Sequence, residues 1–483
     1  MSRIIVGPFN RVEGDLEVKL DISGDAVRQA FVVSTLYRGF ERILNGKAPA
    51  DALVFAPRIC GICSVSQSVA AAKALAAAGG VAIPDNGALA VNTIHATENI
   101  ADHLTHFYLF FMPDFARATY AQEPWYEAVA DRFTAIKGTA TADMLPARAQ
   151  FMHIMGILAG KWPHTLSIQP GGTTRSVAPN EIARLSAILA GFRRFVERSL
   201  LGDKPERVIA LKNRDELAAW AEERRPQSSD FRLFLHVSKA LELEALGNSG
   251  ARFMSYGAYA HGDAYLFPPG VWHNDRVLPV NLDDVSEDMS HAWYDQPNVP
   301  EHPFDGTTFA DALRGDAYSW CKAPRLGGAV VEVGALARQV VAGHPLIRDL
   351  VQSAGGNVHS RVVARVLEIA LVTIAMQDWV RKFHPGETFC HHGDLPDACR
   401  GVGLTEAARG ALGHWLKVSN GKIANYQIIA PTTWNFSPRD ASDTPGALEQ
   451  ALVGAPVRPG ETEPVSVQHI VRSFDPCLVC TVH

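Results

Sequence analysis

The sequence holds two Cys-x-x-Cys pairs, one near each end of the chain. The first is Cys60 and Cys63; the second is Cys477 and Cys480, followed by three residues that end in His483. Two thiols three positions apart can face one metal ion, because a single turn of backbone directs both sulfur atoms to the same side. All four thiolates can meet only if the two ends of the chain fold together. This requirement constrains the fold more than any other feature.

The first pair is predicted to lie where a loop enters a helix. Residues 64–78 are rich in alanine and end at a glycine pair, which is typical of a helix with a glycine C-cap. The helix N-terminus and Arg58 both place positive charge beside Cys60 and Cys63, and positive charge favours thiolate over thiol. Gln67 falls on the first turns of this helix.

Zinc is the simplest ion for four thiolates, because Zn²⁺ binds them tetrahedrally without redox chemistry. Zinc ribbons separate their cysteine pairs by roughly 15–20 residues, whereas here nearly the whole chain lies between the pairs. Soft sulfur ligands also suit nickel and iron, for which geometry and metal delivery matter more than affinity. The spacing therefore leaves zinc, nickel and iron open.

Two other histidine-containing segments could in principle bind a metal. Asp102 and His106 are four positions apart in a predicted helix over residues 84–111, but histidines on a long apolar helix are more often hydrogen-bonded core residues. A separate zinc site is a second possibility, although its adjacent histidines suit one-turn ligation poorly. Its candidate ligands are Cys390, His391, His392 and Cys399.

Composition excludes several classes of protein. The 483 residues are 47% hydrophobic with a formal charge of −6, enough to bury a large core and without the basic block of a nucleic-acid or anionic-membrane surface. Seven cysteines are too sparse for a disulfide scaffold, and no signal peptide precedes Asn10. The most membrane-like stretch, residues 362–380, carries Arg365 and Glu368, so it reads as a buried helix. We expect a cytoplasmic protein without membrane insertion.

The pattern of elements predicts a mainly helical α+β fold. Leu16, Val18 and Leu20 alternate before a turn at residues 23–25, which predicts an N-terminal β-hairpin, and residues 422–430 alternate again. An acidic stretch at 283–303 looks exposed. No linker or repeat is visible, so one domain over 1–483 is expected. Helices are predicted over residues 38–44, 64–78, 84–111, 145–160, 180–201, 215–225, 231–246, 337–353, 358–383 and 467–473.

Residues around both cysteine pairs resemble the two signatures of nickel-iron hydrogenase large subunits. Residues 58–63, Arg-Ile-Cys-Gly-Ile-Cys, are similar to the first, and residues 475–483, Asp-Pro-Cys-Leu-Val-Cys-Thr-Val-His, are similar to the second. The resemblance covers nearly the whole chain and implies the fold of that family. Other segments that look like the family occur in order at residues 11–14, 38–41, 101–103, 318–325, 406–410 and 431–435.

The resemblance implies a nickel-iron centre and a reaction. Cys60, Cys63, Cys477 and Cys480 would hold nickel, and Cys63 and Cys480 would bridge to an iron that carries one CO and two cyanides. The implied reaction is the reversible heterolytic splitting of H₂, with the Cys477 thiolate as first proton acceptor. A thiolate on a cationic metal is a modest base inside a dry site, which agrees with that role.

The same carry-over assigns roles to carboxylates and to the C-terminal imidazole. Glu13 would by itself be an ordinary loop carboxylate, but the resemblance makes it the group that takes the proton from Cys477. Glu41 and His483 match positions that bind a magnesium-like ion together with a backbone carbonyl near residue 428 or 429.

Three charged residues and a threonine match the surroundings of the metals. Arg409 would lie beside them and be held by Asp102 and Asp475, so that no charge is buried unpaired. Thr432 would line the cyanide pocket.

Ile62 and Gln67 indicate a regulatory, H₂-sensing branch. Members that oxidise H₂ for energy usually have valine and histidine at these positions. The bulkier Ile62 would narrow the gas channel, which would improve the discrimination against O₂ by about 1–3 kcal/mol at most. Asp15 and Ala408 also depart from the usual pattern, and neither removes a ligand. A tail that a maturation protease removes after nickel loading is not visible, as in the sensor branch.

The resemblance also implies partners. The three cysteines outside the two pairs are too few for a four-cysteine iron–sulfur cluster, so electrons would leave through a small subunit that carries such clusters, and a sensor would dock a histidine kinase. The alternatives are an energy-conserving uptake hydrogenase, a non-catalytic relative such as the quinone-site subunit of respiratory complex I, whose members lack the four thiols, and a structural zinc protein.

Overall fold

Alternating apolar residues form the N-terminal hairpin that the sequence predicts. Leu16, Val18 and Leu20 are fully buried on one face of β2 (Leu16–Ser23), which pairs with β3 (Ala26–Ser34). A third strand that was not predicted, β1 (Ser2–Val6), pairs with the other edge of β2. This computed structural model describes residues 1–483 apart from 1, 251, 296 and 298.

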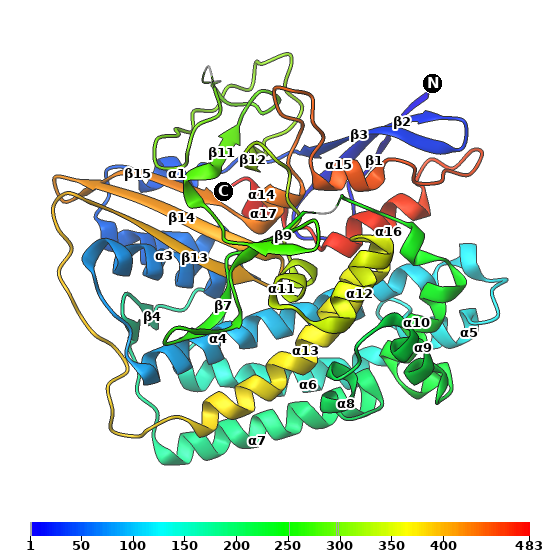
Figure 1. Cartoon of the computed structure of the whole chain (residues 1–483), viewed down its shortest axis with the longest axis horizontal. Helices are drawn as coiled ribbons and strands as arrows, with labels where there is room; N and C mark the ends of the chain where they lie inside the picture. The colour runs from blue at the N-terminus through cyan, green and yellow to red at the C-terminus, as the bar shows by residue number, and fades with distance from the viewer. Residues whose placement is uncertain (1, 251, 296, 298) are drawn as a thin grey trace.

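Long helices make up the body of the molecule (Figure 1). The central helix α13 has buried residues on all sides, as its nearly continuous apolar sequence requires. It packs against α4 and α7, and α6 lies between α4 and α7. These helices confirm the mainly helical prediction: α3 (Ser64–Gly79), α4 (Asp85–Thr105), α6 (Ala140–Leu158), α7 (Pro179–Phe195) and α13 (Val358–Arg381).

A three-stranded sheet near the C-terminal end of the chain supports α3. The sheet has the order β13 (Cys399–Ala407), β14 (Gly410–Ser419), β15 (Lys422–Ile429), and only β15 was predicted. A Cβ atom at Gly401 or Gly403 would collide with carbonyl oxygens of α3. Glycine in the strand and alanine in the helix therefore allow a close approach, which fixes the helix that follows Cys63.

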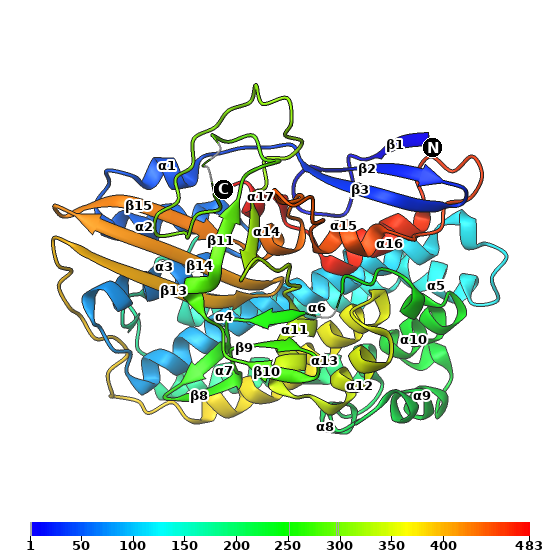
Figure 2. The ribbon, with the colours of Figure 1, turned by 45° about the horizontal axis from the view of Figure 1, so that its top comes forward.

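Segments close to the two ends of the chain pair with each other, and Figure 2 shows the C-terminal helix α17 toward the middle of the molecule. The backbone N–H of Glu13 donates to the carbonyl of Pro476 (3.3 Å), and the N–H of Leu478 donates to the carbonyl of Glu13 (2.8 Å). The C-terminal elements are α14 (Pro431–Asn435), α15 (Ala447–Leu452), α16 (Val465–Phe474) and α17 (Leu478–Thr481).

Three predictions about elements were wrong in part. The stretch 283–303 is not simply an exposed loop, because Glu287 lies in β11 (Val285–Asp288), pairs with β12 (Ala323–Leu326) and is 4% exposed. The predicted helix 337–353 is two helices divided at Pro345, and the helix predicted over 231–246 ends at Ala240. Among the described residues, no helix is both long and apolar enough to cross a membrane.

The other helices and strands are short and connect these parts. The helices are α1 (Phe40–Leu44), α2 (Ala52–Phe55), α5 (Tyr126–Phe133), α8 (Pro205–Ile209), α9 (Arg214–Glu222), α10 (Asp230–Ala240), α11 (Ala335–Ala342) and α12 (Pro345–Ala354). The strands are β4 (Ile168–Gln169), β5 (Gly172–Thr173), β6 (Phe253–Ser255), β7 (Ala258–His261), β8 (Ala264–Phe267), β9 (Gly270–His273) and β10 (Arg276–Leu278).

Candidate metal centre

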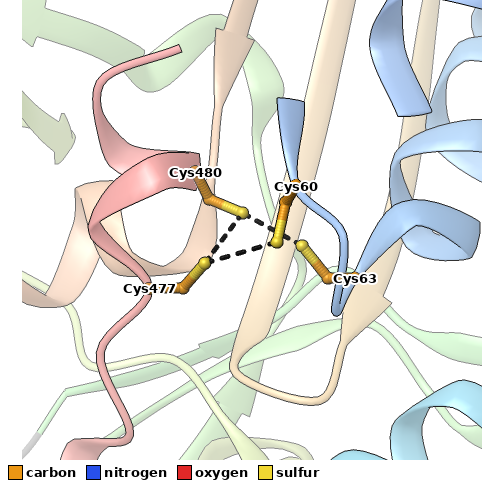
Figure 3. A group of neighbouring side chains, drawn as sticks. All are labelled: Cys60, Cys63, Cys477 and Cys480. Carbon is orange, nitrogen blue, oxygen red and sulfur yellow. Dashed lines mark hydrogen bonds between the residues drawn. The ribbon is translucent and has the colours of Figure 1, made fainter. Parts of the chain in front are cut away.

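The four cysteines of the two pairs meet in the core (Figure 3). The Sγ–Sγ distances are 3.5 Å between Cys60 and Cys477, 3.0 Å between Cys63 and Cys480, and 3.2 Å between Cys477 and Cys480. All four side chains are buried, and their sulfur atoms lie within 4.8 Å of one another. In the described part of the chain this is the one group of three or more potential ligands arranged in this way.

The sulfur cluster fits a soft metal cation. These Sγ–Sγ distances are longer than a disulfide bond, which is about 2.05 Å. They are shorter than the separation of about 3.8 Å between tetrahedral thiolates around an ion with bonds of about 2.3 Å. Burial raises the pKa of the Cys60 and Cys480 thiols, and hydrogen bonds with Cys477 raise the pKa of Cys63. Four thiolates cannot lie so close together without a cation, so the buried thiols keep their protons when no metal is bound. A metal cation would displace these protons and neutralise the thiolates.

Cys477 differs from the other three thiols. Burial opposes its ionisation, but hydrogen bonds with Cys480, Cys60 and Cys63 and the positive charge of Arg409 outweigh burial, so its pKa lies well below the usual value. Its backbone N–H donates to the Thr432 hydroxyl oxygen (3.1 Å). Thr432 therefore lies directly beside the sulfur cluster.

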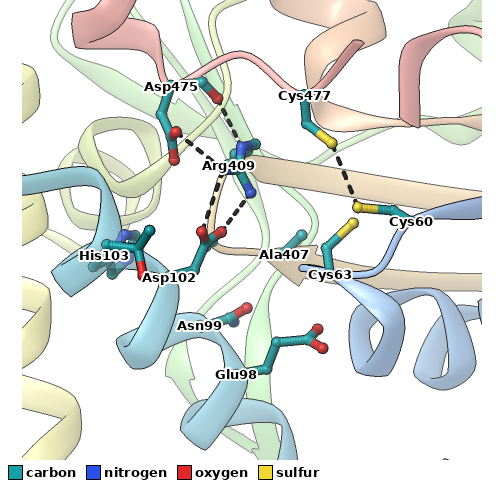
Figure 4. Close-up of polar contacts among 12 residues, drawn as sticks. Cys60, Cys63, Glu98, Asn99, Asp102, His103, Ala407, Arg409, Asp475 and Cys477 are labelled. Carbon is teal, nitrogen blue, oxygen red and sulfur yellow. Dashed lines mark hydrogen bonds and ion pairs between the residues drawn. The ribbon is translucent and has the colours of Figure 1, made fainter. Parts of the chain in front are cut away.

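Arg409 is held over the cluster by two carboxylates (Figure 4). It stands in the tight turn between β13 and β14, and it is 3% exposed. Its Nε donates to the backbone carbonyl of Asp475 (2.8 Å), and its Nη2 donates to Asp475 Oδ1 (3.0 Å) and Asp102 Oδ1 (3.2 Å). Its Nη1 donates to Asp102 Oδ2. Burial raises the pKa of Asp102 to about 6, against the opposing effect of the Arg409 charge.

Glu13 lies beside Cys477 in a short parallel backbone pairing. Its side chain is half-buried. Burial raises the pKa of the Glu13 carboxyl, and the neighbouring Cys477 charge raises it further. A carboxyl with a raised pKa next to an ionisable thiol can exchange a proton with it near neutral pH.

Glu41 and His483 meet in a second buried site. His483 Nε2 lies 3.1 Å from Glu41 Oε1, and Glu41 Oε1 also accepts from the backbone N–H of Ile428 (2.9 Å). His483 Nδ1 lies 2.7 Å from the carbonyl oxygen of Cys480, which ties this site to the cysteines. Burial opposes ionisation of Glu41, but the charges of Lys322 and His483 lower its pKa to about 2.

Sequence reasoning missed three polar neighbours of Glu41. Lys322 Nζ donates to Glu41 Oε2 (3.1 Å), Glu287 Oε2 (3.2 Å) and Gln427 Oε1 (2.8 Å). Glu287 Oε1 is buried without a hydrogen-bond partner. This carboxylate oxygen is therefore available as a ligand for a hard cation such as Mg²⁺. Lys322 could have been found, since it falls inside the family-like segment 318–325, but Glu287 lies in the acidic stretch taken for an exposed loop.

Gln67 is bound to a buried histidine. Gln67 Oε1 accepts from His414 Nε2 (2.8 Å), and His414 Nδ1 accepts from the Tyr426 hydroxyl (2.7 Å), which defines the tautomer. Burial lowers the pKa of His414 to about 3, so this imidazole is neutral. Ile62 is half-buried between Cys60 and Cys63.

The alternative metal sites do not form. His103 pairs with Glu368 (3.1 Å) and His106 Nε2 donates to the Arg472 carbonyl (2.7 Å), so both are core residues as expected. The possible zinc site at residues 390–399 does not form either, because no three of its ligand atoms lie together in the described structure; the Sγ atoms of Cys390 and Cys399 instead face carbonyl oxygens.

A buried four-cysteine centre inside a mainly helical α+β chain defines a candidate metalloprotein. The family model described as "Nickel-dependent hydrogenase" matches residues 38–142 and 118–483. The chain belongs to this family, whose members are oxidoreductases that act on H₂. This membership contradicts the structural zinc alternative.

Relatives and solved structures match over the full length. The chain is 30% identical to the periplasmic [NiFeSe] hydrogenase large subunit of Desulfomicrobium baculatum and 30% identical to the hydrogenase-1 large chain of Escherichia coli K12; each match covers 100% of this chain and 95% of the relative. The crystal structure of a reduced, active Ni-Fe-Se hydrogenase from Desulfomicrobium baculatum matches with a TM-score of 0.85, 27% identity and complete coverage of both chains. The family and the fold predicted from the sequence are confirmed.

Proposed function

We propose that this chain, acting as one domain over residues 1–483, is the H₂-splitting large subunit of a two-subunit nickel-iron hydrogenase and that the assembled enzyme senses H₂. The observation that carries the catalytic part is the meeting of four buried thiols from opposite ends of the chain. When bound there, a nickel-iron group with one CO and two cyanides supplies the binding and heterolytic cleavage of H₂.

The residues around the cluster have distinct tasks in this proposal. Cys477, which lies beside Glu13 in a short parallel backbone pairing, accepts the proton, and Glu13 takes it from Cys477 toward solvent. Arg409 presents a fixed positive charge that Asp102 and Asp475 orient. Thr432 contributes a hydroxyl group to the pocket that receives the cyanides.

A second ion and further proteins complete the proposal. Glu41 and His483 hold Mg²⁺ beside the C-terminus, with Lys322 and Glu287 around it. Electrons leave through a small subunit with iron–sulfur clusters, which agrees with relatives named as large subunits. Maturation proteins load the metals, and the cytoplasmic location stays a prediction.

The sensing role rests on Ile62 and Gln67. In this proposal Ile62 narrows the path of gas to the metals, and Gln67, fixed by His414, replaces a histidine. An energy-conserving uptake hydrogenase is the alternative; one relative, 29% identical, is named as the uptake hydrogenase large subunit of Bradyrhizobium diazoefficiens.

Co-purification and phosphorylation separate the two roles. The enzyme should be purified with its small subunit and mixed with the histidine kinase of the same organism. A sensor binds the kinase and changes its autophosphorylation rate under H₂. Failure to bind, together with rapid dye-linked H₂ oxidation, would assign the chain to the uptake role.

A further inference from the structure

The residue that begins helix α3 is a cysteine of the metal centre. Cys63 occupies the N-cap position, where Ser, Thr, Asp or Asn normally accepts hydrogen bonds from the first free N–H groups of the helix. The Cys63 side chain makes no such bond, because it points to the other cysteines. The N–H groups of Val65 and Ser66 are buried and need another acceptor.

Glu98 supplies this acceptor from a different helix. It lies on α4, is 1% exposed, and in Figure 4 its carboxylate lies below Cys63. Glu98 Oε2 accepts from the N–H of Val65 (2.8 Å), and Glu98 Oε1 accepts from the N–H of Ser66 (2.9 Å). The hydroxyl groups of Ser64 and Ser66 donate to the same two oxygens at 3.2 Å each.

We propose that Glu98 is the N-terminal cap of α3 and thereby a positioning residue for Cys60 and Cys63. A side chain at position 63 cannot both cap the helix and hold a metal. The carboxylate from α4 takes over the capping, which leaves the Cys63 sulfur free to face the metal. A negative charge at this end of α3 also agrees with the helix dipole.

The loop around Trp162 also binds Glu98 and the cysteine segment. The Trp162 indole N–H donates to Glu98 Oε2 (2.9 Å), which adds a third element to the groups that hold this carboxylate. His164, in the same loop, binds the segment that carries Cys60 and Cys63. Its backbone N–H donates to the Ser64 hydroxyl oxygen (3.2 Å), and its ring Nδ1 donates to the carbonyl of Pro57 (2.9 Å). The segment that carries Cys60 and Cys63 is therefore held from both ends.

The same helix braces both halves of the centre. One turn after Glu98, Asp102 binds Arg409, so α4 orients the cysteine loop through one carboxylate and the guanidinium through the other. Displacement of α4 relative to α3 would therefore move both the cysteine segment and Arg409. Residues that orient metal ligands in this way typically affect affinity or activity about 10- to 100-fold when they are replaced.

Glu98→Gln is the decisive variant, because glutamine keeps the shape and removes the second acceptor oxygen. Its NH₂ group must face one of the two N–H donors, so either Val65 or Ser66 loses its partner. The matched control is Glu449→Gln. Glu449 is also fully buried, burial also raises its pKa to about 7, and it also accepts a backbone N–H, from Val32, but it lies on α15 away from the cysteines.

The test measures amide hydrogen exchange at residues 64–66, nickel content and the infrared bands of the assembled enzyme. We expect Glu98→Gln to lose protection at these amides by about tenfold and to lose nickel or H/D exchange activity by about 10- to 100-fold, with displaced CO and cyanide bands. Glu449→Gln should stay within about twofold of wild type. Wild-type bands, nickel content and protection in Glu98→Gln would overturn the proposal.

A milder variant covers the case in which Glu98→Gln does not fold. Trp162→Phe keeps an aromatic ring, although a smaller one, and removes the hydrogen bond to Glu98. Shifted bands with an unchanged melting temperature support the positioning role of Glu98, and wild-type bands refute it. The inference rests on the proposed role of the cysteines as nickel ligands. If wild-type enzyme itself lacks nickel and infrared bands, that role fails, whereas amide protection at residues 64–66 still tests the cap.

Discussion

Replacement of Glu13 by glutamine tests the proposed proton route. Glutamine has the same shape but cannot accept a proton, so the Cys477 proton loses its first destination. Asp102 is the other carboxyl whose charge raises the pKa of Glu13, and both of its oxygens already accept from Arg409. Asp102 is therefore poorly placed to take over the relay.

The expected loss can be estimated from the role of a single relay group. A positioned acid or base contributes about 10²- to 10⁴-fold, which corresponds to about 3–5 kcal/mol in the barrier. We expect Glu13→Gln to lower both H₂ oxidation and H/D exchange with solvent by that factor, because both need the proton to leave Cys477. Metal content should not change, since Glu13 is not a proposed ligand.

The assay compares H/D exchange by mass spectrometry in wild type, Glu13→Gln and the control Glu17→Gln, which changes a carboxylate of strand β2 beyond the proposed route. In wild type the rate should rise with pH as Glu13 ionises, since the carboxylate form accepts the proton and the pKa of Glu13 is raised. Turnover and exchange of Glu13→Gln within about twofold of wild type, with the same pH profile, would refute the route.

Three further predictions concern other parts of the structure. Asp114→Asn should destabilise the chain by about 3–5 kcal/mol in urea unfolding, because buried Asp114 binds Arg472 (2.8 Å) and Arg11 and so joins the two segments that lead to Cys477 and Glu13; a midpoint unchanged from wild type would contradict this role. The pKa of Asp114 is well below its usual value because the His469 and Arg472 contacts outweigh burial, so the stability that it adds is present above about pH 4 and is lost as pH falls. Glu41→Gln should remove Mg²⁺ measured by elemental analysis while nickel stays bound, and equal magnesium in both proteins would exclude this site. Ile62→Val with Gln67→His should speed inactivation by O₂, with a change of about 1–3 kcal/mol in discrimination at most; unchanged inactivation kinetics would argue against the gas-channel role.

Local patterns predicted most of the elements, because their signals lie within a few neighbouring residues. The alternation from Leu16 gave the hairpin, and the alanine run after Cys63 gave α3. Strand β13 was missed because Gly401 and Gly403 weaken its strand pattern, and the reason for these glycines is contact with α3, which is distant in sequence. The break at Pro345 is hard to predict because apolar residues recur at helical spacing on both sides of it.

The candidate site divides in the same way. The cysteine pairs carry a spacing signal, and the resemblance pointed to Arg409, Asp102 and Glu41, which the structure brings into the contacts described above. Glu98 carries no sequence signal, because a carboxylate in a helix is ordinarily exposed and its partners at residues 64–66 lie on another helix. The local sequence predicts a solvated Glu287, because Lys322, the cation that binds it in the structure, comes later in the chain.

The most direct test of the central claim is the infrared spectrum of the purified enzyme under air and under H₂, with nickel analysis of the same sample. If Cys60, Cys63, Cys477 and Cys480 hold a nickel-iron centre, the spectrum has one carbonyl band and two cyanide bands that shift under H₂, and nickel is present. A sample without these bands that contains zinc in place of nickel would contradict the account.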